Sequence, residues 1–280
     1  MKVRVFYETR YRYEDKVSFS PHVFRLFPKA DTDIRVDRFA FETNEGADIQ
    51  HRRDLFDNIA THCYYPDRFA ELWARLEMEV ELRERNAFHF LLDSRALEMP
   101  FHYQEEELLV LQPFLRKREP GVRLPFWHFQ PGSTIGTLVD LNRAIQDHLR
   151  YERRDEGAAR LPEETLSAGA GACRDFAVLL AETLRGLGIA ARLASGYLLE
   201  FGDGARTAEG ALHAWTEAYL PGAGWIGMDP TNGVFCNHLH IPAAVGIGPA
   251  DVTPISGTYY ADRHVSSSMS AQLQITTCPS

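Results

Sequence analysis

The chain has 280 residues, of which 45% are hydrophobic and 25% are charged. At about 150 residues per domain, this length predicts two domains with the composition of an ordinary globular protein. Thirty Lys and Arg against 39 Asp and Glu leave a net charge of −9, which argues against a chain-wide attraction to nucleic acid or anionic lipid. We therefore expect neither a nucleic acid nor a membrane as a partner.

The four cysteines are scattered and none is spaced C-x-x-C, which argues against a disulfide framework, a zinc ribbon or a dithiol redox motif. The N-terminus is charged and lacks the apolar segment of a secretory signal. No stretch approaches the roughly 18 apolar residues that span a bilayer. These features predict a reducing, cytoplasmic setting, and no motif predicts a cofactor.

The first half of the chain shows mainly the patterns of strands. Val3, Val5 and Tyr7 alternate with polar residues, the period of a half-buried strand. Residues 68–76 fit a short helix equally well. We expect a β-rich, sandwich-like domain over residues 1–118, followed by a linker over 119–134, where three prolines and two glycines interrupt any regular pattern.

From residue 135 onward the hydrophobic period becomes helical. One helix is predicted over residues 137–151 and a second over about 172–187, with Gly188 as a left-handed residue after its end. Strands are expected over 189–201, 212–220 and 225–229. This mixture predicts an α+β domain over 135–280.

Cys173 is expected at the start of the second helix, directly after four small residues. A helix N-terminus presents unpaired N–H groups and a partial positive charge, which favour a thiolate over a thiol. The structural alternative is a buried, inert cysteine. Because larger residues such as Phe176 and Leu180 already fill the apolar stripe, we favour a reactive thiol.

His213 and Asp229 lie on two strands joined by a tight turn over residues 221–224. In an antiparallel hairpin, the numbers of any two paired residues add up to the same constant, which defines the register. If this sum is 444, Asp229 lies opposite Trp215 and is a diagonal neighbour of His213 on one face of the hairpin. A sum of 445 would send Asp229 to the other face. Each residue alone has a structural interpretation, since His is common in sheets and Asp often precedes Pro at turns. Together with Cys173 they predict a nucleophile, a base and an orienting carboxylate.

These residues lie within a series of motifs that resembles the core of the transglutaminase-like superfamily over about residues 135–233. The motifs are GACRDFA at 171–177, GIAAR at 188–192, SGY at 195–197, HAW at 213–215, GW at 224–225 and DPT at 229–231. Ser20-Pro21-His22 and Asp57-Asn58 resemble the β-rich domain that precedes this core in bacterial members, and residues 240–257 resemble the segment that follows it, except at Gly248-Pro249.

The resemblance implies a papain-like α+β core preceded by an N-terminal β-sandwich-like domain. It also implies a triad with Cys173 as nucleophile, His213 as general base and acid, and Asp229 as the residue that orients the imidazole. Residues 135–280 would then be the catalytic core with a C-terminal extension. The expected chemistry is acyl transfer at an amide or peptide bond through a thioester.

Three functions fit this reading. We favour hydrolysis of a peptide, protein or amide substrate, because no feature marks a channel for an amine. The second is a protein-glutamine transglutaminase with an amine acceptor, and the third is a non-catalytic binding module on the same scaffold. The chain contains no EF-hand-like run, so calcium dependence is not expected.

Two further features have one expected role each, and three others have two interpretations. Asp175 is expected to stabilise the helix start, and the N–H of Cys173 is a candidate oxyanion donor. His238 and His240 could share one strand face, but two histidines without a third ligand make a weak metal site. Residues 202–211 form a glycine-rich loop that could cover the site or be an exposed connection. Finally, Trp215 and Trp225 could line a cleft or only pack.

Overall fold

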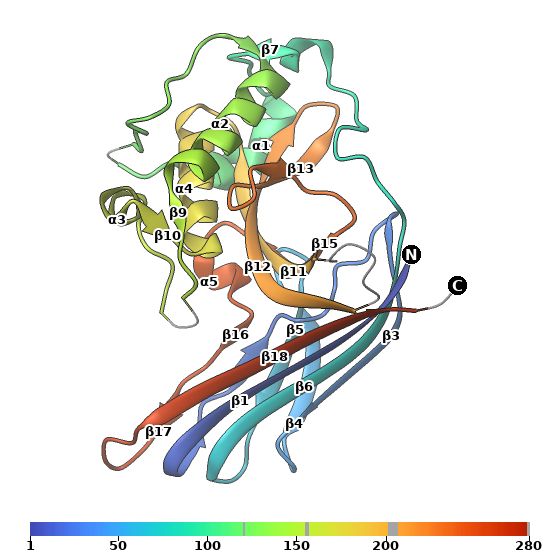
Figure 1. Cartoon of the computed structure of the whole chain (residues 1–280), viewed down its shortest axis with the longest axis vertical. Helices are drawn as coiled ribbons and strands as arrows, with labels where there is room; N and C mark the ends of the chain where they lie inside the picture. The colour runs from blue at the N-terminus through green and yellow to red at the C-terminus, as the bar shows by residue number, and fades with distance from the viewer. Residues whose placement is uncertain (120, 155–156, 201–206, 279–280) are drawn as a thin grey trace.

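A computed structural model describes residues 1–119, 121–154, 157–200 and 207–278. The fold is α+β, as predicted: helices gather at one end of the molecule, and long strands form the other end (Figure 1). In the described part of the chain, no helix is long and apolar enough to cross a membrane.

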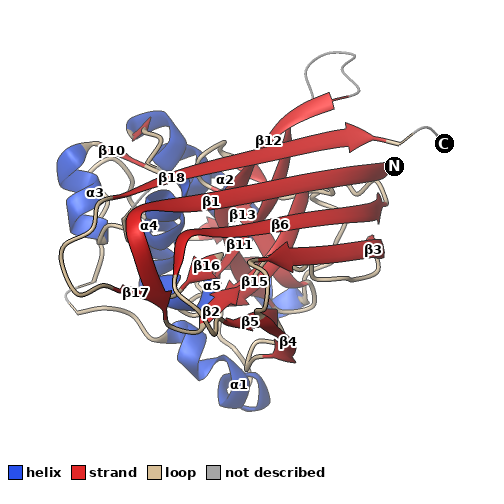
Figure 2. Cartoon of the chain, turned by 90° about the horizontal axis from the view of Figure 1, so that it is seen from below, coloured by secondary structure: helices blue, strands red, loops and turns tan. Residues whose placement is uncertain are grey.

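Four long strands run side by side across the strand-rich end (Figure 2). Their order is β18 (Ser267–Thr277), β1 (Lys2–Phe19), β6 (Phe69–Leu82) and β3 (Ile34–Thr43), and every pair is antiparallel. Alternate residues of β1, among them Val3 and Val5, are buried, which is the period-2 pattern read from the sequence. The helical alternative for residues 68–76 is wrong, because residues 69–76 belong to β6, in which Leu72, Ala74 and Leu76 are the alternate, buried positions.

A second, smaller sheet packs against these strands. It contains β16 (Ile255–Ser256), β2 (His22–Phe24), β5 (Ile59–Tyr64) and β4 (Asp48–Arg53). Val5 and Leu76 of the long sheet share one apolar cluster with Phe24 and Cys63 of the smaller one. The N-terminal part therefore resembles a sandwich. Three strands near the C-terminus also belong to these sheets: β16 pairs with β2, and both β17 (Tyr259–Tyr260) and β18 pair with β1. The end of the 135–280 segment therefore lies in the sheets of the N-terminal part.

The helix α4 (Cys173–Gly186) lies in the middle of the other part. It packs against the neighbouring strands β11 (Ala191–Glu200) and β12 (Thr207–Leu220), and the hydroxyl of Thr216 donates to the carbonyl of Ala177 at 2.8 Å. The sheet continues from β12 to β13 (Gly224–Asp229) and β14 (Val234–Phe235), while β15 (His240–Gly246) pairs with β11. Pairing of β12 with β18 joins this sheet to the long strands of the N-terminal part.

Short elements complete the chain around this core. They are a 3-10 turn (Ser94–Ala96), β7 (Glu98–Met99), α1 (Glu105–Leu115), β8 (Gly132–Ser133), α2 (Thr134–His148), β9 (Arg150–Tyr151), α3 (Pro162–Ala168), β10 (Ala170–Gly171) and α5 (Pro249–Val252). The sequence did not predict α1 or α3. The apolar residues of α1 at 108–111 are consecutive rather than spaced along one face, and Leu109 and Val110 are exposed.

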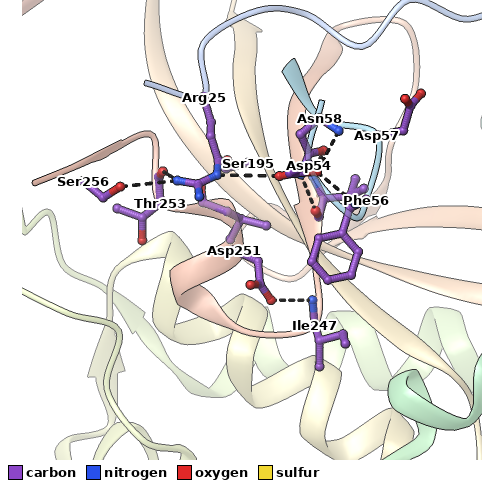
Figure 3. A network of polar contacts seen from close by, with 12 residues as sticks. Arg25, Asp54, Phe56, Asp57, Asn58, Ser195, Ile247, Asp251, Thr253 and Ser256 are labelled. Carbon is purple, nitrogen blue, oxygen red and sulfur yellow. Dashed lines mark hydrogen bonds and ion pairs between the residues drawn. The ribbon is translucent and has the colours of Figure 1, made fainter. Parts of the chain in front are cut away.

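A loop of the N-terminal part, over residues 54–58, forms hydrogen bonds with β15. The amide of Asn58 donates to the carbonyl of Val245 at 2.8 Å and accepts from its N–H at 2.9 Å. Asp54 accepts hydrogen bonds from the N–H groups of Phe56 and Asn58, and Arg25 lies on its other side (Figure 3). Asn58 thus satisfies both main-chain polar groups of Val245, as a neighbouring strand would do.

At Gly196, β11 and β15 approach each other too closely for a side chain. A Cβ atom there would lie 2.0 Å from the carbonyl oxygen of Ile241. We expect Gly196→Ala to lower the free energy of unfolding by about 3 kcal/mol, because β15 would have to move. Gly186→Ala is the matched control: a Cβ there meets no atom within 4 Å, so its effect should stay within about 1 kcal/mol. Urea unfolding followed by circular dichroism measures both, and equal stability of the two variants would contradict this packing argument.

Candidate active site

Cys173 is the first residue of α4, and Ala172 before it is extended. The buried carboxylate of Asp175 accepts the N–H of Ala172 at 2.8 Å and the N–H of Arg160 at 2.7 Å. The guanidinium of Arg154 donates to it at 2.9 Å. Asp175 thus stabilises the start of the helix and fixes the segment that carries the thiol, the role expected from its position.

The thiol of Cys173 is partly exposed and forms a hydrogen bond with the ring of His213 and another with the main chain of Ala214. Burial by itself would raise the pKa of this thiol. The hydrogen bond with His213 and the charge of its ring outweigh burial, so the pKa of Cys173 is lowered. A lowered pKa increases the fraction of thiolate, the nucleophilic form of cysteine.

His213 is buried on β12 and contacts Asp229 at the end of β13. The two strands pair with Thr216 opposite Met228 and Tyr219 opposite Trp225, which confirms the predicted register. Nε2 of His213 donates to Oδ2 of Asp229 at 2.9 Å, which leaves Nδ1 for the thiol. Burial lowers the pKa of His213, but the hydrogen bonds with Asp229 and Cys173 and their charges raise it to about 10. The imidazolium is therefore the stable form beside a thiolate.

The carboxylate of Asp229 is completely buried, so its charge depends on hydrogen bonds. The strand β13 ends at Asp229, and the turn after Pro230 folds back so that Oδ1 accepts the N–H groups of Thr231 at 2.9 Å and Asn232 at 3.3 Å. The side chain of Asn232 donates to Oδ2 at 2.8 Å. Burial would raise the pKa of Asp229, but the bonds from His213 and His240 lower it overall.

His240 is a contact of Asp229 that sequence reasoning missed. Its Nε2 lies 3.2 Å from Oδ2 of Asp229. His238, by contrast, lies in a turn before β15, and its Nδ1 accepts the N–H of Arg85 at 3.4 Å. The expected common face of the two histidines is therefore absent, because they do not share one strand. In the described residues, no group of three or more His, Cys, Asp or Glu side chains is arranged to hold a metal ion.

The two tryptophans have different surroundings. Trp215 is buried beside Cys236 and Val245, and its ring centre lies 6.3 Å from that of His213. Trp225 lies under the guanidinium of Arg192, 4.3 Å from it. Both line a cavity of about 220 Å³. Trp215 therefore packs against the site as well as forming a cavity wall.

The other cysteines differ from Cys173. Burial raises the pKa of Cys63 to about 12 and raises that of Cys236 well above its usual range. Cys278 is partly exposed. The predicted glycine-rich loop over residues 202–211 is wrong for residues 207–211, which extend β12 because they pair with β11 and β18. Residues 202–206 lie outside the described residues, so the two interpretations of the loop stay predictions for these alone.

The site thus holds a thiol, an imidazole and a carboxylate in one hydrogen-bonded series, with Cys173, His213 and Asp229 brought together from α4, β12 and β13. This series can deprotonate a thiol, hold the resulting imidazolium and return its proton to a leaving group. The residues chosen from the sequence are those that the structure brings together.

Comparisons with known proteins agree with this arrangement. Residues 131–230 match the model of the transglutaminase-like superfamily, and residues 3–81 match that of the bacterial transglutaminase-like N-terminal region. The chain is 42% identical over 269 residues to an uncharacterized protein of Mycobacterium leprae, covering 92% of this chain and 93% of that one.

Two further similarities are more distant. A crystal structure from Cytophaga hutchinsonii, described as a "Putative Cysteine Protease", matches 100% of this chain and 91% of its own with a TM-score of 0.74 at 17% identity. A protein-glutamine gamma-glutamyltransferase of Pseudomonas aeruginosa is 30% identical over 110 residues, which are 37% of this chain and 16% of that protein. With the two family models and a relative matched over nearly its whole length, the chain belongs to the transglutaminase-like superfamily.

Proposed function

We propose that this protein is a cysteine-dependent hydrolase of amide or peptide bonds that works through a thioester. The observation that carries the proposal is the hydrogen-bonded series from the thiol of Cys173 through His213 to the buried carboxylate of Asp229. The lowered pKa of the thiol and the raised pKa of the imidazole favour the ion pair that such a reaction needs.

In the first half of the reaction, the thiolate of Cys173 attacks the carbonyl carbon and forms a carbon–sulfur bond. The main-chain N–H of Cys173, at the start of α4, is a candidate donor to the oxyanion that develops. Nδ1 of His213 then gives its proton to the leaving amine as the carbon–nitrogen bond breaks. Asp229 holds the ring and stabilises its positive charge throughout.

In the second half, neutral His213 removes a proton from water while the water oxygen attacks the thioester. The carbon–sulfur bond breaks, a carboxylic acid leaves, and the proton returns to the Cys173–His213 pair. The substrate class that fits is a peptide, a protein side-chain amide or a small amide, because the chemistry requires only an accessible carbonyl.

The second candidate is transfer of the acyl group to an amine, as in a protein-glutamine transglutaminase. The similarity to the Pseudomonas aeruginosa glutamyltransferase over 110 residues favours it. The same three residues serve both reactions, and the outcome depends on whether water or an amine reaches the thioester. A non-catalytic module is less well supported, because the three residues are present and hydrogen-bonded.

Alkylation tests the reactive thiol without any knowledge of the substrate. At about pH 6, iodoacetamide should label Cys173 and not the buried cysteines, whose pKa values are raised by burial. Cys173→Ala should remove this labelling, as measured by mass spectrometry of peptides from the folded protein. Cys278→Ala is the control and should leave it unchanged. Labelling at low pH that survives Cys173→Ala would refute an activated thiol at this position.

Removal of the orienting charge tests the role of Asp229. Asp229→Asn keeps the size of the side chain but loses the charge that holds the imidazolium, so acyl transfer should fall on the order of 10²- to 10⁴-fold. The far-ultraviolet circular dichroism spectrum should stay that of the wild type. Asp251→Asn, a change at another capping carboxylate, is the control for a general effect on the fold. A wild-type rate in Asp229→Asn would remove Asp229 from the mechanism.

Trapping of the acyl-enzyme tests whether water or an amine accepts the acyl group. A library of peptides and simple amides is mixed with the protein, and intact mass spectrometry detects an adduct that depends on Cys173. With hydrolysis as the proposed reaction, the free acid should dominate even in the presence of a millimolar primary amine. A product dominated by the amine conjugate would instead establish the transferase, and no adduct from any substrate would count against both enzymes.

A further inference from the structure

His240 lies between the buried carboxylate of Asp229 and a cavity. It is the first residue of β15, and its Nε2 lies 3.2 Å from Oδ2 of Asp229. The edge of its ring meets Trp215, with the ring centres 5.5 Å apart. His240 is only 6% exposed, so the strand and the indole hold the ring closely.

The cavity has a volume of about 220 Å³, and His240 forms part of its wall. Among the described residues that line it, Asp229 and His213 are absent. Six charged side chains line it instead, three of each sign: Lys29, Asp31, Asp33, Arg85, Arg192 and Glu217. A cavity of this volume, lined by charged side chains, is large and polar enough to hold water.

The bonding of His240 defines its tautomer. Because Nε2 faces a carboxylate oxygen, which can only accept, the proton of the neutral ring lies on Nε2. Its Nδ1 is buried and has no hydrogen-bond partner among the described residues. In this tautomer, Nε2 donates to Asp229 and Nδ1 carries only a lone pair.

Shielding of Asp229 matters to the thiol through His213. The attraction between the carboxylate and the imidazolium is strong while both are buried, and it weakens when water surrounds the carboxylate. Besides His240, the ionisable groups that interact with this pair are Cys173 on α4 and Cys236 after β14, and the charge of Arg174 also acts on the thiol. Of these, only Cys173 forms a hydrogen bond with His213.

We propose that His240 is a positioning residue of the site, which donates a hydrogen bond to Asp229 and closes the side of the carboxylate that faces the cavity. This inference rests on the proposed function, since it assigns His240 a role through the Asp229–His213 pair. Without a ring at this position, water from the cavity would reach Oδ2 of Asp229, and the electrostatic attraction between Asp229 and His213 would weaken. The thiolate of Cys173 would then be less stable.

The test is the rate of Cys173 alkylation by iodoacetamide as a function of pH, which needs no substrate. The two informative variants are His240→Asn and His240→Gln, which carry the same amide on side chains that differ by one methylene. The amide nitrogen of Gln can reach the place of Nε2, whereas that of Asn falls short. His238→Asn is the matched control, because His238 lines the same cavity without contacting Asp229.

We expect the rise of the alkylation rate with pH to move upward by about one pH unit in His240→Asn. His240→Gln and His238→Asn should keep the wild-type profile, and thermal unfolding should show that all variants are folded. A wild-type profile in folded His240→Asn would overturn the inference, as would an equal shift in Asn and Gln. An unfolded His240→Asn would leave His240→Gln to decide: a wild-type profile supports the donor role, and a shifted one refutes it.

These outcomes can be separated from failure of the proposed function. If Cys173 of the wild-type protein is not alkylated at low pH, the proposed function is wrong, and the role of His240 that rests on it is wrong as well. If wild-type Cys173 is reactive and His240→Asn matches it, only the role of His240 is wrong.

Discussion

The buried charge of Asp229 is the constraint on which the site depends. A carboxylate without solvent is stable only if its lone pairs are occupied by donors. Here the donors come from β12, from the turn at 231–232 and from the start of β15. The amide of Asn142 on α2 also donates to the main-chain carbonyl of Asp229 at 3.2 Å. These contacts hold Asp229 where it bonds His213, the residue that contacts the thiol.

The N-terminal strands support this arrangement from outside the core. Asn58 satisfies the polar groups of Val245, β18 pairs with both β1 and β12, and Gly196 allows β15 to approach β11. The strand that carries His240 is thus held between the core sheet and a loop of the N-terminal part. The sandwich-like region is in this sense a structural part of the site, although it supplies none of the three residues in the proposed triad.

The sequence predicted the features that depend on local pattern. The start of α4 and the hairpin of β12 and β13 follow from hydrophobic period, turn residues and face alternation. The register of the hairpin was chosen because only one of two registers brings Asp229 to the face of His213, and the structure has that register. The contact of His240 with Asp229 depends on how a later strand returns beside β11, which no local pattern encodes. Pairing of β1 with β18 joins residues more than 250 positions apart, and α1 lacks an apolar stripe.

The most direct measurement is the protonation state of His213, by nitrogen-15 NMR of the imidazole rings over a pH titration with a Cys173→Ala protein for comparison. The account predicts that His213 stays an imidazolium through neutral pH in the wild type, because its pKa is raised to about 10, and that loss of the thiol lowers that pKa. A His213 ring that loses its proton near the ordinary value of 6.5 in both proteins would contradict it.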